Sequence, residues 1–405
     1  MAQAILLRGA KQLLTLRGPS GARRGPALRE LGLIEDGSVL IRDGMIIAVG
    51  TSRRVENLKE ARAAFEIPVN GKVVMPGFVD PAINLDLEEH LTGAAEPAKR
   101  QKLAEFLDRM IPLLRSCSRH GTLTAELKIE AGIQDIPANL AVFRQLARRS
   151  SSIRTVRTCR IGQPTEPNKD TSNDTAESLS ELARRKLVRY VEFEAPQELT
   201  ERDRSFLGAV ERSQLEVKLL WPGGAPDKLA PALARLNPVA VSCPLNVTSD
   251  ECTALAQTSA IAVFSTAKEF FELPNAVCAR GAIDLGVAIA LSTGYDFRHA
   301  LTLNMQTTVA FGVLRLRLTP EEAITAATIN AACATGSDDS TGSLEAGKQA
   351  DLLVLDLPDY REISRQFGVN HVEIAMCGES IVFNRTSLPL ESELRPRRRV
   401  ASEGT

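Results

Sequence analysis

Residues 73–85 read Val-Val-Met-Pro-Gly-Phe-Val-Asp-Pro-Ala-Ile-Asn-Leu, and they mark a change in the pattern of the chain. Before this stretch, the turn-forming pairs Asp36-Gly37 and Asp43-Gly44 separate short apolar runs, which is the pattern of β-hairpins. After it, short apolar strands alternate with amphipathic helices up to about Gly336. The sequence therefore predicts a hairpin-rich region followed by a region of strand–helix units.

Eight strand candidates lie in the second region, at residues 73–85, 122–129, 153–161, 187–194, 216–220, 238–243, 261–264 and 287–293. The segments between them have helical spacing of apolar residues, and the first such helix ends at His120-Gly121. A later helix opens with Thr319 and Glu322, the pattern of a capping box, and should end at Gly336. Eight strands alternating with helices predict an α/β fold, a (β/α)₈ barrel.

After the barrel, the sequence again shows short apolar runs separated by turn residues. The two flanks of the chain should therefore pair with each other. We expect residues 1–72 and 337–385 to form one small composite β-domain and residues 73–336 to form the barrel. Residues 386–405 are rich in arginine, serine and glutamate, which predicts a flexible tail.

Bulk composition excludes several classes of function. The net charge of −1 gives no electrostatic footprint for nucleic acid or an anionic membrane. No run approaches the ~18 apolar residues of a membrane span. The seven cysteines are scattered singly, which favours a reducing compartment, so we expect a cytoplasmic protein.

Four separated motifs resemble the amidohydrolase superfamily and, within it, imidazolonepropionase, over roughly residues 1–385. They are Met75-Pro76-Gly77-Phe78-Val79-Asp80, residues 342–352, His120-Gly121-Thr122 with Glu126-Leu127-Lys128, and residues 367–372 preceded by residues 359–363. The resemblance implies a barrel enzyme that hydrolyses C–N bonds with a divalent metal, which lowers the pKa of a bound water.

The same resemblance implies that the metal site has been lost. The family's His-x-His pair on the first strand falls on Ala82 and Asn84, and the histidine of the fifth strand falls on Leu220. The remaining substituted positions are a glutamate on Gly223, the sixth-strand histidine on Cys243, and the eighth-strand aspartate on Gly294. Alanine cannot bind a metal, and a neutral amide is a weak ligand for zinc or iron. We therefore expect no bound metal and a catalytically degenerate site.

Several leftover groups could form a replacement site. Asp296 could reach the barrel mouth or could cap its loop. Glu126 with Lys128, and Glu216 with Lys218, could line the barrel, where paired buried charges are commonly structural. The other candidates have a structural reading as well: Asp86, Glu88, Glu89 and His90 as a solvated helix start, Cys243 as a small apolar filler, His371 as a structural histidine, and Arg298-His299 as a surface pair.

Two functions therefore remain open. The first is a metal-free binding or scaffold protein, with a small-molecule ligand and with a second copy or an active paralogue as partner. The second is an active hydrolase of cyclic amides or amidines, with a site rearranged around Asp80, Asp86, Glu126, Lys128 and Asp296. Only this second function would call for zinc or iron. Metal content and the lining of the barrel mouth discriminate between them.

Overall fold

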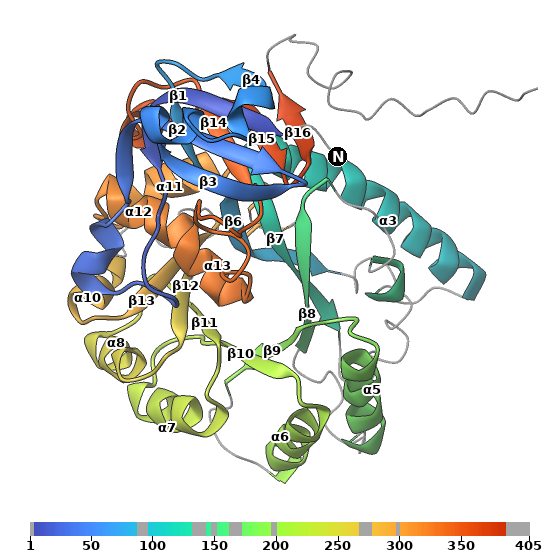
Figure 1. The fold of residues 1–405 in the computed structure, drawn as a ribbon. Helices are drawn as coiled ribbons and strands as arrows, with labels where there is room; N and C mark the ends of the chain where they lie inside the picture. The colour runs from blue at the N-terminus through green and yellow to red at the C-terminus, as the bar shows by residue number, and fades with distance from the viewer. Residues whose placement is uncertain are drawn as a thin grey trace, which may run out of the picture.

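The fold of this computed structural model consists of a parallel β-barrel and a second, mixed β-sheet (Figure 1). The structure describes residues 4–86, 96–131, 143–146, 152–161, 172–195, 201–266, 278–296 and 300–385. The expected tail, residues 386–405, lies outside the described residues. No described helix is long and apolar enough to cross a membrane.

The barrel contains eight strands in the order in which they occur along the chain. They are β6 (Phe78–Asp86), β7 (Thr122–Ala131), β8 (Arg154–Ile161), β9 (Tyr190–Glu194), β10 (Glu216–Leu220), β11 (Ala240–Cys243), β12 (Ile261–Ser265) and β13 (Ala288–Ser292). Every neighbouring pair in this order is parallel. The eight expected strands are confirmed, because each expected range overlaps one of these elements.

The first and last strands meet at a seam without a regular ladder. A single parallel bridge joins Ile83 to Tyr295, and the backbone N–H of Asn84 donates to the carbonyl of Tyr295 at 2.8 Å. The seam closes the barrel just beyond the end of β13.

Helices lie outside the barrel and between the sheets. Their bounds are α1 (Ser52–Glu56), α3 (Glu96–Arg119), α5 (Ser172–Arg184), α6 (Glu201–Ser213), α7 (Pro226–Leu236), α8 (Ser249–Ala256), α10 (Cys278–Asp284), α11 (Met305–Leu314), α12 (Pro320–Ala327), α13 (Ile329–Thr335) and α14 (Glu362–Arg365), with 3₁₀ turns at Gly25–Arg29 and Ala61–Ala63. The capping box of Thr319 and Glu322 is confirmed. The single helix expected from there to Gly336 is wrong, because the chain leaves helical geometry at Thr328 and forms α12 and α13.

The break at Thr328 lets α13 close one end of the barrel. Its residues Ala331, Ala332 and Ala334 are fully buried and pack with interior side chains of β11 to β13, such as Ala240 and Ala290. Small side chains allow the helix to approach the strands closely. Because α13 contacts the interior near the starts of the strands, only the C-terminal ends of the strands are left for a site.

The flanks of the chain form one composite β-domain, with strand order β16-β15-β14-β5-β1-β2-β3 and β4 paired to β1. The bounds are β1 (Ile5–Leu14), β2 (Leu33–Arg42), β3 (Met45–Thr51), β4 (Phe65–Pro68), β5 (Val73–Pro76), β14 (Leu352–Leu355), β15 (Val372–Cys377) and β16 (Ser380–Asn384). The single strand expected over residues 73–85 is therefore two strands. The chain divides at Gly77, where β5 ends in the composite sheet and β6 starts the barrel.

Candidate functional site

Charged side chains enter the barrel from β7 to β10. Successive residues of a strand face opposite sides, and on β7 the apolar Leu127 and Ile129 pack in the main hydrophobic cluster. Glu126 and Lys128 therefore face the interior, where they are 0% and 1% exposed. Burial of such charges is costly unless each finds a partner.

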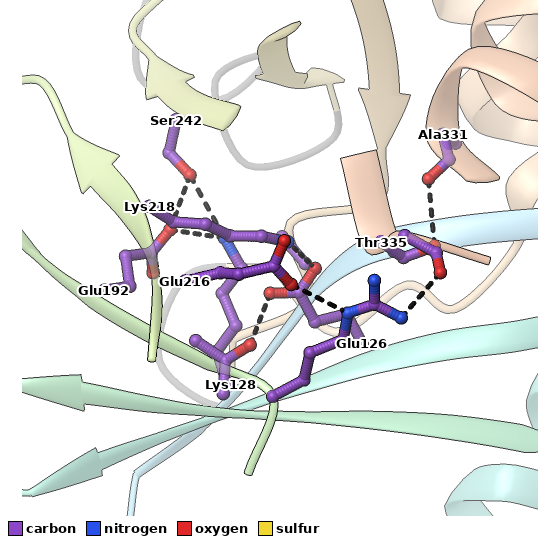
Figure 2. A network of polar contacts seen from close by, with 12 residues as sticks. Glu126, Lys128, Glu192, Glu216, Lys218, Ser242, Ala331 and Thr335 are labelled. Atoms are coloured by element: carbon purple, nitrogen blue, oxygen red, sulfur yellow. Dashed lines mark hydrogen bonds and ion pairs between the residues drawn. The ribbon is translucent and has the colours of Figure 1, made fainter. Parts of the chain in front are cut away.

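Glu126 and Lys218 form one ion pair across the interior (Figure 2). The Glu126 carboxylate also accepts a hydrogen bond from the Thr158 hydroxyl at 2.6 Å. The Lys218 ammonium lies 4.0 Å from the centre of the Tyr190 ring, within cation–π range. Burial lowers the pKa of Lys218, while the charge of Glu126 opposes that shift.

Glu192 is the centre of a second, larger group. Its carboxylate accepts from the Lys128 ammonium at 2.6 Å, from the Arg160 guanidinium at 2.7 Å and from the Ser242 hydroxyl at 3.0 Å. Burial alone would raise the pKa of Glu192, but the charges of Arg160 and Lys128 outweigh burial and lower this pKa to about 2. Glu192 therefore stays ionised near neutral pH and cannot act as a proton donor there.

Glu216 does not join these two groups, although it alternates with Lys218 on β10. Its side chain is 50% exposed and pairs with Arg189 at 3.1 Å. Arg189 in turn donates to the carbonyl of Gly336, directly after α13, at 2.6 Å. Figure 2 shows Glu216 on the side of the network that faces Thr335. Glu216 therefore links the barrel wall to α13.

Asp80 occupies the seam between the first and last strands. Its fully buried carboxyl group accepts from the hydroxyls of Ser292 and Thr293 at 2.6 and 2.5 Å, and from the backbone N–H groups of Thr293 and Ala82 at 3.3 and 3.2 Å. Burial raises the pKa of Asp80, and the hydrogen bonds from Ser292 and Thr293 oppose that rise. These contacts connect β6 to the end of β13 where the backbone ladder is missing.

The positions to which the resemblance assigns the family's catalytic residues lie toward the C-terminal ends of the strands. Ala82 and Asn84 are in the second half of β6, and Leu220 is the last residue of β10. Gly294 follows β13, and Cys243 ends β11. Ala82 is buried, and the Asn84 amide group already donates to the Tyr295 carbonyl at 3.0 Å.

Cys243 differs from the other strand-end positions. Its neighbour Ser242 faces the interior network, whereas Cys243 packs in the hydrophobic cluster between barrel and helices with Val241 and Leu245. The apolar-filler alternative agrees with this packing.

Gly223 also departs from what a catalytic residue would require. Its backbone has φ +86°, and a Cβ atom there would lie 3.2 Å from Pro244. A side chain at this position would be strained. The loop after β10 thus has a backbone shape that disfavours the family's glutamate.

Of the other candidate residues, the structure describes Asp296 and His371. The backbone of Asp296 pairs with Ala300, beside the seam. His371 is buried at the start of β15, and its backbone N–H donates to Gln306 at 2.9 Å. The side chain of Asp86 and all of Glu88, Glu89, His90, Arg298 and His299 lie outside the described residues. A catalytic role for Asp296, Glu126 or Lys128 stays a prediction.

Comparisons with known proteins agree with this geometry. The model of the amidohydrolase family matches residues 226–381. An imidazolonepropionase from Chloroflexus aggregans is 31% identical over 94% of this chain and 99% of the relative, and one from Brevibacillus brevis is 30% identical over 94% and 98%. The chain belongs to the amidohydrolase family. Among solved structures, E. coli guanine deaminase matches this amidohydrolase with a TM-score of 0.68 at 19% identity, over 95% of this chain and 100% of the other, which supports the fold alone.

At the positions to which the resemblance assigns the family's metal ligands, the described side chains do not fit the metal that the resemblance implies. Four of these positions carry the methyl group of Ala82, the amide of Asn84, which donates to Tyr295, the isobutyl group of Leu220, and the hydrogen atom of Gly294. Zinc and iron require imidazole, thiolate or carboxylate donors there. Among the described residues, no group of three or more histidine, cysteine, aspartate or glutamate side chains could hold a metal ion.

The polar residues that carry the resemblance make structural contacts instead. Asp351 binds the guanidinium of Arg154 at 2.6 Å, which joins the composite β-domain to the barrel. Asn370 accepts from Gln306 at 2.8 Å and donates to the Arg119 carbonyl at 3.0 Å. Asp80 closes the seam. These three motif residues thus have structural contacts in the fold.

Sequence reasoning found Glu126, Lys128 and Lys218 but missed Glu192, the partner of Lys128, and Arg160, which also pairs with Glu192. Both residues lie on strands that were expected. The glutamate between the apolar Val191 and Phe193 could have indicated a charge that points into the barrel. The pairing of Asp80 with Ser292 had no local signal, because the two residues are 212 positions apart.

Proposed function

We propose that this chain is a metal-free, catalytically degenerate amidohydrolase that acts as a binding or scaffold protein. The observation that carries the proposal is the set of side chains at the strand ends, where Ala82, Asn84, Leu220 and Gly294 replace the family's ligands. Without such a ligand set, no metal can lower the pKa of a water to the neutral range. We expect the protein in the cytoplasm.

Three fully buried carboxylates of the described interior, those of Glu192, Glu126 and Asp80, do not supply the lost chemistry. A general base must be able to accept a proton from its target, but Glu192 is held ionised by Lys128 and Arg160. Glu126 and Asp80 are fully buried and already hydrogen-bonded to neighbouring side chains. Glu192, Glu126 and Asp80 therefore each have a structural use.

Metal analysis and an activity assay test this proposal together. The protein is expressed with zinc and iron supplied, beside the imidazolonepropionase of Brevibacillus brevis as an active control. We expect far less than one metal per chain and no ring opening of imidazolone propionate above background, while the control is active. Each ~1.4 kcal/mol of lost transition-state stabilisation slows the reaction tenfold.

One metal per chain together with turnover of the imidazolone would overturn the proposal. It would favour an active hydrolase of cyclic amides or amidines with a rearranged site.

A further inference from the structure

Half-buried side chains form a rim at the C-terminal ends of the neighbouring barrel strands β6 to β10. The rim consists of one side chain from each strand, those of Asn84, Glu130, Arg160, Glu194 and Leu220. One inward-facing position deeper, the side chains of β7 to β10 are buried, namely Lys128, Thr158, Glu192 and Lys218. The barrel is therefore closed at the level of the charge network, and from this end the rim is the first layer that solvent reaches.

The polar side chains of the rim face the interior from different strands. Glu130 and Glu194 each lie two residues beyond a member of the charge network, and residues two apart share a face of a strand. Asn84 lies between Ile83 and Leu85, which pack in the main hydrophobic cluster, so the Asn84 amide is on the opposite face of β6. The amide and the two carboxylates therefore belong to one inner surface.

The Asn84 amide has an oxygen atom without a partner. Its nitrogen donates to the carbonyl of Tyr295 at 3.0 Å, and because a carbonyl oxygen only accepts, this contact fixes which branch of the amide is the nitrogen. The oxygen on the other branch is buried and accepts no hydrogen bond. An unsatisfied buried acceptor is costly, so this atom marks a position where a bound group can donate.

The carboxylates of Glu130 and Glu194 are acceptors as well. Within the described part of the chain, neither forms a hydrogen bond or an ion pair, in contrast to the paired glutamates one layer deeper. The charge network itself carries one positive charge in excess, because Glu192 faces two cations while the other pair is neutral. The two carboxylates of the rim outweigh this excess, so this end of the barrel favours a cation.

We propose that a small organic cation with several N–H groups, a guanidinium or an amidinium, binds at the rim. Its N–H groups donate to the carboxylates of Glu130 and Glu194 and to the Asn84 oxygen, and hydrogen bonds between charged partners are the strong ones. The isobutyl group of Leu220 packs against the carbon part of the ligand. Arg160 does not compete for these acceptors, because its guanidinium is bound to Glu192 at 2.7 Å.

Two further observations limit the class of ligand. The interior of an eight-stranded barrel has room for side chains or for one small ligand, which excludes a large molecule within the barrel. A metal ion fits less well than an organic cation, because no three metal-binding side chains come together among the described residues. The proposal rests on the binding function above and names the class of its ligand.

Calorimetric titration of the full chain with methylguanidinium tests the proposal. Tetramethylammonium is the comparison, because it has the same charge and no N–H group. We expect saturable binding of methylguanidinium that weakens as salt is added. Tetramethylammonium should bind at least about tenfold more weakly, since it cannot donate to the three acceptors.

Variants of the rim assign the contacts. Glu130→Gln and Glu194→Gln keep the size of the side chain and remove its charge, and each should weaken binding of methylguanidinium about tenfold. Asn84→Leu removes the neutral acceptor and should weaken binding by a smaller factor. The control Glu216→Gln changes a carboxylate at the opposite end of the barrel, where it pairs with Arg189, and should leave the affinity unchanged. Circular dichroism confirms that each variant is folded.

Several results would overturn the proposal. They are a wild type without saturable binding, equal affinity for the two cations, unchanged affinity in both glutamine variants of the rim, or an equal loss in the control. Metal-dependent turnover of the imidazolone would refute the proposed function, whereas the titrations test the rim alone, so the two failures are distinguishable.

Discussion

Lys218 and Glu126 show how one buried charge depends on another. Both side chains are removed from water and satisfy each other inside the barrel. Loss of one partner leaves a buried charge without compensation, which typically costs about 3–5 kcal/mol. Replacement of both by neutral groups of similar size costs less, because no charge is then left in the interior.

We therefore predict a strongly non-additive double-mutant cycle. Lys218→Met should lower the free energy of unfolding by about 3–5 kcal/mol, and Glu126→Gln/Lys218→Met by clearly less than the sum of the single changes. Urea unfolding followed by circular dichroism gives the values. Lys228→Met, a change on α7 outside the barrel, is the control. Additive losses would show that the two residues do not act as a pair.

Asp80 is a second residue whose role is structural. Its replacement by alanine removes the acceptor of four hydrogen bonds and leaves two buried hydroxyls at the seam, so we expect a loss of about 3 kcal/mol or more. Asp80→Asn keeps one oxygen acceptor and should lose less. The control Asp284→Asn changes an exposed surface pair and should stay within about 0.5 kcal/mol. Unfolding in urea measures all three, and an Asp80→Ala protein of wild-type stability would contradict the role of the seam.

At the scale of elements, strand-level prediction succeeded because each barrel strand is an apolar run buried on its outer face. Leu127, Val191 and Ile289 are examples: each is an apolar residue of its strand, and each lies in the main hydrophobic cluster. The helix break at Thr328 and the division at Gly77 escaped prediction. Both depend on which sheet or barrel end the following segment meets, and that information is not local.

The strand ends support a prediction about metal affinity. Ala82→His, Asn84→His, Leu220→His and Gly294→Asp together should raise zinc affinity by bringing imidazole and carboxylate donors to one end of the barrel. Full activity should not return, because the strained backbone at Gly223 disfavours the missing glutamate. Calorimetric titration with zinc measures the gain. The matched control places glutamine and asparagine at the same positions, and equal zinc binding by the control would contradict the ligand assignment.

At the scale of the molecule, two histidines lie near the junction of barrel and composite β-domain. The Gln306 side chain binds the carbonyl of His120 and the backbone N–H of His371. Burial lowers the pKa of both imidazoles below the usual 6.5, with nearby positive charge contributing at His120. The unfolded chain therefore takes up protons at these histidines before the folded chain does.

Stability should consequently fall as the pH falls below about 6.5 and continue to fall until the folded histidines protonate. We expect a lower melting temperature at pH 5.5 than at pH 7.5, measured by circular dichroism in buffers of equal ionic strength. The variant His371→Gln should reduce this dependence. A melting temperature that does not change over this range would contradict the assignment.

Fold class was predictable from the sequence because the strand–helix alternation of the barrel differs from the hairpin pattern of the flanks. The loss of the metal site stays a prediction, made from the identities of single residues such as Ala82. The network of Glu192 and Arg160 was not predictable, since partners on neighbouring strands come together only after the barrel closes. The exposure of Leu314 and Phe367 was not predictable either, because both side chains are as apolar as those of the core.

The seam has a consequence for the chain while it is being synthesised. Asp80 emerges from the ribosome 212 residues before Ser292, its partner. At ~5–20 residues per second this interval lasts roughly 10–40 s. During that time the edge of the first barrel strand has no neighbour on one side and exposes unpaired backbone groups. A prematurely terminated chain never acquires that neighbour, so truncated products of this gene should depend on chaperones far more than the full-length chain.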